Sequence, residues 1–240
     1  MQRPDYGYDA PYVLLMFAAA SGGCGIAALV FLFQRQNHPA LIMGVYFVFF
    51  FANAGSFFYT TRRGKFVEWR RILNGLQLRG NELVLDMGCG RGAVLNAVAR
   101  KLTSGRVTGI DIWSVADQSG NAREVTLRNV SLEGVNERVQ IETGDMRKLP
   151  YPDASFDLIV SSLAIHNISS NTDRKLAISE GFRVLKSGGR MVIVDIRATR
   201  LYERALRELG AANVERHLLG WRMWWGNPFA STNIVSASKP

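Results

Sequence analysis

Hydrophobic positions are arranged differently in the two parts of the chain. No charged residue occurs between Pro11 and Gln34, or again between Pro39 and Thr61. Each stretch has the ~20 apolar residues that a helix needs to cross a bilayer. A short polar turn at 34–38 separates them, so the pattern predicts an antiparallel pair of transmembrane helices. We expect these helices at about 12–33 and 40–61, within a membrane anchor formed by residues 1–61.

The apolar stretches allow two other interpretations. One is a cleaved signal peptide in the first stretch, where Ala18 and Ala20 resemble a small-residue cleavage site. Against this, the first ten residues hold one arginine and two aspartates, and a second apolar stretch follows. The other is a pair of buried helices in a soluble core, but two consecutive uncharged stretches of this length are unusual there. The membrane hairpin therefore remains the prediction.

Residues 62–79 have the pattern of a basic amphipathic helix next to the membrane. Phe66, Trp69, Leu73 and Leu76 are spaced three, four and three residues apart, and arginines occupy the other faces. We expect this helix to pack on the following domain and to help cover a bound ligand.

From residue 80 onward, short apolar runs alternate with helical patterns. The expected strands are 83–87, 106–111, 139–144, 156–162, 190–196, 214–219 and 232–238. The expected helices are 92–102, 117–132, 172–185 and 200–209. Alternation at this spacing predicts an α/β domain over residues 80–240, with a doubly wound, mostly parallel seven-stranded sheet covered on both faces.

Charge adds an orientation to this picture. The net charge is +9, yet residues 1–61 contain two basic and two acidic residues, so the excess lies in residues 62–240. It begins directly after the second apolar stretch, with Arg62, Arg63 and Lys65. The positive-inside rule then predicts that the folded domain and the N-terminus both face the cytoplasm. Anionic lipid headgroups account for this basic cluster more simply than nucleic acid, for which no binding module is visible.

Cysteine and histidine usage favours neither disulfide nor metal chemistry. Cys24 falls inside the first apolar stretch and Cys89 inside the later domain, so the two are expected in different compartments. Two such cysteines and three histidines do not form a recognisable metal-binding pattern. We therefore expect no metal site.

The most informative motif begins at Val84. An apolar run containing Asp86 leads into Gly88, Gly90 and Gly92, and a second run ends on Asp111, nineteen residues after the last glycine. Glycines let a backbone approach a nucleoside closely, and an acid on the next strand accepts the ribose hydroxyls. Asp86 would repel a pyrophosphate but suits an ammonium group. NAD is therefore the less favoured ligand.

This motif and three later segments resemble the class I S-adenosylmethionine-dependent methyltransferases, of the type that methylates ubiquinone and lipids. The later segments are 142–146, 149–160 and 183–194, with Ser187 where proline is usual. The resemblance covers roughly residues 66–240. It implies a Rossmann-like methyltransferase fold with an antiparallel closing strand, and S-adenosyl-L-methionine as cofactor.

The resemblance also implies roles for individual residues. Asp86 would hold the amino end of the cofactor, and the glycines would allow close approach of the backbone. Asp111 would bind the ribose and Asp145 the adenine amine. The remaining cofactor neighbours would be Ile112, Met146 and Ser161.

Two segments are candidates for the acceptor pocket. His166 has a near-neutral unperturbed pKa and is predicted to act as general base, with Asn167 as a positioning group; the alternative is a histidine that binds loop backbone. Trp221, Trp224 and Trp225 follow the sixth strand, where they would wall an apolar pocket or enter the bilayer interface. The alternative for these tryptophans is ordinary aromatic packing.

These features together predict a membrane-anchored methyltransferase that takes a lipophilic acceptor: a lipid amine, an isoprenoid or quinone phenol, or a small hydrophobic thiol. The alternatives are a membrane-tethered protein or RNA methyltransferase, and a non-catalytic cofactor-binding membrane protein. Neither the acceptor atom nor the oligomeric state follows from the sequence.

Overall fold

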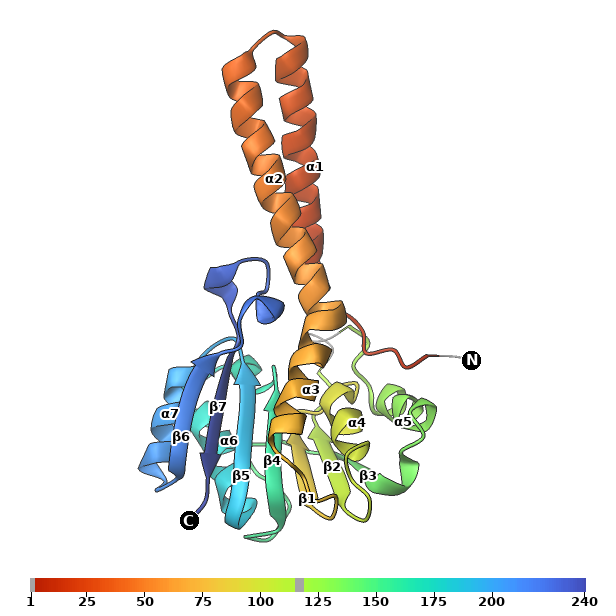
Figure 1. Cartoon of the computed structure of the whole chain (residues 1–240), viewed down its shortest axis with the longest axis vertical. Helices are drawn as coiled ribbons and strands as arrows, with labels where there is room; N and C mark the ends of the chain where they lie inside the picture. Colours follow the sequence, from red (N-terminus) through yellow and green to blue (C-terminus); the bar gives the residue numbers. More distant parts are fainter. Residues whose placement is uncertain (1–2, 115–118) are drawn as a thin grey trace.

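A helical hairpin stands on an α/β domain in the computed structural model, which describes residues 3–114 and 119–240 (Figure 1). The hairpin consists of α1 (Pro11–Phe33) and α2 (Asn37–Tyr59). Helix α2 does not stop at the domain, because a π-helical turn (Thr60–Gly64) joins it to α3 (Lys65–Gly75). The three segments form one helix of 39 residues, so the predicted boundary between anchor and juxtamembrane helix is not a break in the chain.

The sheet has seven strands in the order β3-β2-β1-β4-β5-β7-β6, and only β7 runs antiparallel to its neighbours. This is the doubly wound, mostly parallel sheet that the sequence predicts, with the expected antiparallel closing strand. The strands are β1 (Leu83–Met87), β2 (Arg106–Asp111), β3 (Val139–Thr143), β4 (Phe156–Ser162), β5 (Leu185–Asp195), β6 (Ala212–Leu218) and β7 (Asn233–Ser238).

The domain helices are α4 (Ala93–Ala99), α5 (Arg123–Leu132), α6 (Asn171–Val184) and α7 (Thr199–Glu208). Four short helical turns lie at Asn136–Arg138, Ile165–Asn167, Trp221–Met223 and Pro228–Ala230. The predicted helix at 117–132 is found from Arg123, and the start of that prediction, at 117–118, lies outside the described residues.

Strand β5 begins five residues earlier than predicted, at Leu185 rather than 190. It follows α6 directly, and Leu185 pairs with Phe156 before the register shifts between Phe156 and Leu158. The glycines at 188 and 189 suggest a turn in the sequence, but the extended pairing includes them as an irregularity of the ladder.

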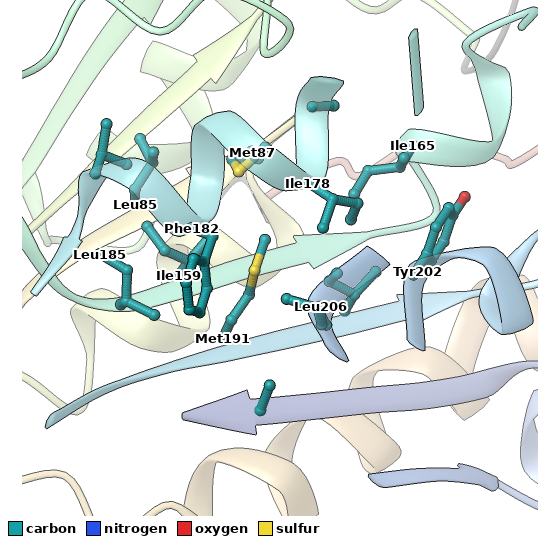
Figure 2. Close-up of a cluster of buried hydrophobic side chains, with 14 of the residues drawn as sticks. Leu85, Met87, Ile159, Ile165, Ile178, Phe182, Leu185, Met191, Tyr202 and Leu206 are labelled. Atoms are coloured by element: carbon teal, nitrogen blue, oxygen red, sulfur yellow. The ribbon is translucent and has the colours of Figure 1, made fainter. Parts of the chain in front are cut away.

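Apolar side chains form a core on each face of the sheet. One core lies under α6 and α7, where Met87, Ile159 and Met191 meet Ile178 and Leu206 (Figure 2). The other lies under α3 and α4 and includes Trp69, Leu73 and Leu95. Helix α3 is therefore part of the domain core, which agrees with its predicted amphipathic pattern.

The hairpin leaves most of its apolar surface uncovered. Both helices are long and apolar enough to cross a membrane, and only 6% and 11% of their most apolar windows are buried. Small residues line the contact between them: Ser21 Oγ donates a hydrogen bond to the Phe47 carbonyl oxygen (3.2 Å), and Gly25 faces the Phe47 ring. Buried core helices of a soluble protein would be covered on the faces that are open here.

Candidate functional site

A cavity of about 1050 Å³ lies at the carboxyl ends of the parallel strands. It includes the ends of β1 and β4, between which the strand order reverses, and open α/β sheets bind ligands at such a point. Its lining includes Phe66 and Trp69 of α3, Asp86 of β1, and six residues at and after the end of β4, between Ser162 and Ser169. The cavity is thus bounded by the sheet edge and by the continuation of the hairpin helix.

The glycine turn after β1 takes a backbone shape that side chains would prevent. Gly88, Gly90 and Gly92 have positive φ angles of 75°, 49° and 84°. A Cβ on Gly88 would lie 2.3 Å from the Cβ of Ala164, so this position accepts no side chain without displacing the segment after β4. The turn brings the backbone of residues 88–90 to the cavity, as the motif predicts.

Asp86 is a buried carboxyl group that lines the cavity and lacks a partner. Neither oxygen has a hydrogen bond of ordinary geometry to any residue in the described part of the chain. Burial raises its pKa to about 8, helped by the negative charge of Asp111, while the N–H of Leu95 acts in the opposite direction. An orphaned, buried acid of this kind suits a cationic group, and the ammonium of S-adenosylmethionine would supply one.

Asp111 also lines the cavity but is already held by the protein. Its Oδ2 accepts from Gly90 N (2.8 Å), and its Oδ1 accepts from Trp113 N (2.6 Å) and from Asn121 Nδ2 (3.3 Å). These bonds join the ends of β1 and β2 and fix the rotamer of the carboxylate. Each carboxylate oxygen can accept more than one hydrogen bond, so the group keeps capacity for ribose hydroxyls.

The residues predicted around the adenine also reach the cavity. Ile112, Asp145 and Met146 line it, and Ile112 is 64% exposed. Asp145 binds the fork of Arg147, with its Oδ2 2.6 Å from Arg147 Nη2, and this hydrogen bond is the main reason why the pKa of Asp145 is lowered. Arg147 was not anticipated in the sequence. An adenine that donates a hydrogen bond to Asp145 would have to share this carboxylate with the guanidinium or displace the guanidinium.

Ser161 does not line the cavity. Its side chain is 1% exposed, and its Oγ donates to the Met87 carbonyl oxygen (2.8 Å), which ties β4 to β1. The neighbouring Ser162 faces the cavity instead and accepts a hydrogen bond from Trp69 Nε1 (2.8 Å). Side chains alternate across a strand, so a shift of one residue exchanges the two roles.

His166 points away from the cavity as well. Its Nδ1 lies 2.5 Å from Oδ1 of Asp195, a fully buried acid. The other oxygen of that acid, Oδ2, accepts from His166 N (3.0 Å) and from the hydroxyl of Tyr202 (3.1 Å). The neighbouring Ala164 and Asn167 do line the cavity. The imidazole thus faces a buried carboxylate, and not the cavity or the loop backbone that the alternative expects.

The three tryptophans pack against α2 rather than along the main cavity. The rings of Trp225 and Phe57 lie 5.2 Å apart, as do those of Trp221 and Tyr59. Strand β6 does run parallel to β5, so the loop emerges at the predicted edge of the sheet. The loop contacts the hairpin helix there. The tryptophan side chains therefore do not line the cavity that contains Asn167.

An N-terminal strap, residues 5–9, lies beside the glycine turn and was not predicted. Asp5 forms an ion pair with Arg91 (2.7 Å), and Tyr6 lines the cavity, where its hydroxyl donates to Glu133 (2.6 Å). At the other end, Asp9 forms an ion pair with Lys65 of α3 (2.6 Å). These partners are 56 to 127 residues apart, and no local pattern marks such pairings.

Comparison with known proteins shows which sequences the chain is similar to. Residues 85–193 match the model of the methyltransferase domain family. The chain is 35% identical over 127 residues to 27-O-demethylrifamycin SV methyltransferase of Amycolatopsis mediterranei, covering 52% of this chain and 42% of that protein. It is 32% identical over 134 residues to the ubiquinone/menaquinone biosynthesis C-methyltransferase UbiE of Geotalea daltonii, covering 55% and 53%. The chain thus spans about half the length of these curated relatives or less.

Solved structures agree on the fold. A SAM-dependent methyltransferase from Aquifex aeolicus superposes with a TM-score of 0.54 at 20% identity, over 70% of this chain and 88% of that one. A geranyl diphosphate methyltransferase in complex with SAM gives 0.58 at 14% identity, over 73% and 85%. The [4+2]-cyclase SpnF gives 0.58 at 20% identity, over 71% and 81%. The fold is therefore shared by proteins described as different kinds of enzyme.

Residues 85–193 thus match a methyltransferase domain, in agreement with the resemblance seen in the sequence. The assignment rests on the sequence match, since the structural likeness by itself shows only the fold.

Proposed function

We propose that this chain is a membrane-anchored methyltransferase that transfers a methyl group from S-adenosylmethionine to a lipophilic small molecule. The observation that carries the proposal is continuity: the helix that borders the cavity is the end of the apolar hairpin helix. Helix α3 contributes Phe66, Val67 and Trp69 to the cavity, and α2 leads into it without interruption. An acceptor dissolved in the bilayer would thus be concentrated next to the site.

The hairpin as a membrane anchor is supported by length, composition and exposure. Leu15, Ile26, Leu41 and Phe51 are among many large apolar side chains on α1 and α2 that are more than half exposed. The strap before α1 and the domain after α2 contact each other through Asp5 and Arg91, so both ends of the hairpin lie on one side. The basic cluster after α2 supports a cytoplasmic location for that side.

The cofactor would be held by residues that the structure brings to one edge. Asp86 would face the ammonium group, Asp111 the ribose hydroxyls, and Ile112 and Met146 the adenine. When bound there, the cofactor would supply an activated methyl group for transfer to the acceptor. The protein's task is to hold the acceptor in line with the bond to that methyl group and to exclude water.

The acceptor would lie against the segment after β4. The cavity residues of this segment are Ser162, Leu163, Ala164, Asn167, Ile168 and Ser169. None of these six side chains titrates near neutral pH, so the segment offers positioning and an apolar wall rather than a base. We accordingly assign Asn167 to orient the acceptor. His166 would act only through the loop that it organises.

Known relatives support a small-molecule acceptor over a macromolecular one. Their names refer to a rifamycin, to ubiquinone or menaquinone, and to a sterol (a Caenorhabditis elegans protein 28% identical over 137 residues). A lipid amine, an isoprenoid or quinone phenol and a hydrophobic thiol all remain candidates.

One experiment tests the proposal. The detergent-solubilised full chain is incubated with membrane extract and S-adenosylmethionine carrying a radioactive methyl group, and lipid, protein and RNA are then separated. We expect the label in the lipid fraction. Label confined to protein or RNA, or absent from all fractions while the cofactor still binds, would contradict the proposal. The Asp111→Ala variant provides the background.

A further inference from the structure

The loop between β6 and β7, residues 219–232, rises along the side of α2 (Figure 1). We call it the tryptophan loop. Thr60 Oγ1 and Ser56 Oγ both donate to the Trp224 carbonyl oxygen, at 2.6 and 3.2 Å. One to two turns further along α2, Asn227 Nδ2 donates to Asn53 Oδ1 (3.0 Å). These bonds hold the loop at a defined height on the helix.

That height can be expressed as a depth in a bilayer. A helix rises about 1.5 Å per residue, so a hydrocarbon core of about 30 Å takes up about 20 residues. If the core begins just after the polar turn that precedes Pro39, it ends close to Phe58. Asn53 then lies roughly 7 Å inside the core on this rise per residue. Because Asn227 is bonded to Asn53, the tip of the loop lies at the same depth.

The side chains at the tip fit an apolar setting. Phe229, at the tip, is 100% exposed, and Trp221, nearer the domain and packed on Tyr59, is 52% exposed. The amide groups that accompany them are paired: Asn53 is 4% exposed and bonds to Asn227 and to the Phe49 carbonyl oxygen. A polar group in hydrocarbon must be satisfied within the protein, and this pair meets that requirement.

Charged groups lie on the domain side of these residues. Arg62 and Arg63 are exposed on the π-helical turn, and the Arg222 guanidinium stacks on the Trp221 ring at 4.7 Å. Tryptophan and tyrosine favour the headgroup level of a membrane, and arginine favours anionic headgroups. The order along the helix is thus apolar tip, aromatic belt and then cations, which is the order of a leaflet from core to surface.

We propose that the tryptophan loop inserts into the leaflet facing the domain, with Phe229 in the acyl region and Trp221 at the headgroups. Its partner is the lipid leaflet itself. The inference rests on the membrane anchoring proposed above and adds a third contact to the two helices. With the loop inserted, the domain is held at one height and tilt, and α3 with its cavity stays near the membrane surface.

Site-directed spin labelling tests this depth in the full chain. The chain is reconstituted in bilayers of phosphatidylcholine containing phosphatidylglycerol, with Cys24→Ser to remove the hairpin thiol; Cys89 is buried and stays. Labels are placed with Phe229→Cys, with Leu29→Cys on the hairpin, and with Ser187→Cys at the start of β5. Collisions with oxygen, which enters lipid, are compared with those of a water-soluble nickel complex.

We expect the label at 229 to resemble that at 29, with oxygen collisions exceeding nickel collisions, and the label at 187 to show the reverse. If 29 reports lipid while 229 resembles 187, the inserted loop is wrong and the anchor survives. If 29 itself reports water, the membrane anchor fails and the inserted loop fails with it.

Discussion

The glycine turn after β1 and the tryptophan loop after β6 emerge at the same edge of the sheet, but they serve different purposes. Both need positive φ angles, at Gly88 (75°) and at Gly226 (108°). The glycine turn opens onto the cavity, with the neighbouring Asp86 carboxyl unpaired. The tryptophan loop is bound to α2 through the Trp224 carbonyl oxygen. Both loops start at the carboxyl edge of the sheet. Which element packs against each loop then determines whether it borders the cavity or contacts the hairpin.

The largest expected effect comes from breaking the docking of the tryptophan loop. A Cβ on Gly64 would lie 1.9 Å from the Arg222 carbonyl oxygen, so Gly64→Ala forces helix and loop apart. We expect a loss of about 3 kcal/mol in the free energy of unfolding, seen as a lower Tm in detergent. Gly75→Ala is the control, because nothing lies within 4 Å of its added Cβ. Equal Tm values for the two variants would contradict the docked arrangement.

The glycine-turn side of the comparison is tested at Asp111. Asp111→Ala removes the proposed acceptor for the ribose and the acceptor for Gly90 N. We expect cofactor affinity to fall by about 2–3 kcal/mol, roughly 30- to 150-fold, since hydrogen bonds to charged groups are the stronger ones. Calorimetry measures this directly. Asp153→Ala, at a carboxylate that is 77% exposed, should leave affinity unchanged; an unchanged Kd in Asp111→Ala would overturn the site.

The unpaired Asp86 predicts a pH dependence. Its pKa of about 8 without cofactor means that the carboxyl is protonated at neutral pH, and a bound ammonium would favour the ionised form. Binding must then release a proton, so affinity should rise up to about tenfold per pH unit between pH 5.5 and 7.5, below the range in which an α-amino group titrates. Calorimetry in buffers of different ionisation enthalpy counts the proton. Asp86→Asn should abolish the slope, and a slope that survives in this variant would show that Asp86 is not its source.

The same carboxyl affects the stability of the cofactor-free protein. The folded form holds a proton that the unfolded form, with a pKa near 3.8, has lost. Stability should therefore decrease as the pH rises from about 4 to 8 and then level off. Chemical denaturation across this range measures the trend, with Asp86→Asn again as the control.

The smallest expected effect on catalysis is at His166. Because the imidazole faces Asp195, His166→Ala should leave turnover within about twofold and lower the free energy of unfolding by about 1–2 kcal/mol, through a weakened buried acid network. Asn167→Ala, at a cavity residue, should instead raise the acceptor KM. A loss of about 10²–10⁴ in turnover for His166→Ala would restore it as a general base.

Local signals determined most of the domain. Apolar runs that end on acids predicted β1 and β2 within the observed bounds, because a strand buried on both faces admits little else. The glycine motif then predicted Asp86 and Asp111 at one edge of the sheet, since parallel strands present their carboxyl ends together. The resemblance to the methyltransferases added Asp145 and Ile112 there. The predicted start of β5 was wrong because two adjacent glycines are as typical of a turn as of a bulge in a strand.

Only the tertiary structure decided what covers that edge. The Asp5–Arg91 pair, the exchange of roles between Ser161 and Ser162, the turning of His166 toward Asp195 and the docking of Trp224 on Thr60 all depend on which surfaces meet in space. Residue type and spacing along the chain predict strands and helices, because their periodicity depends on residues that are close in sequence. Contacts between segments far apart depend on the packing of whole elements, and here a single helix running from the hairpin into the domain sets that packing.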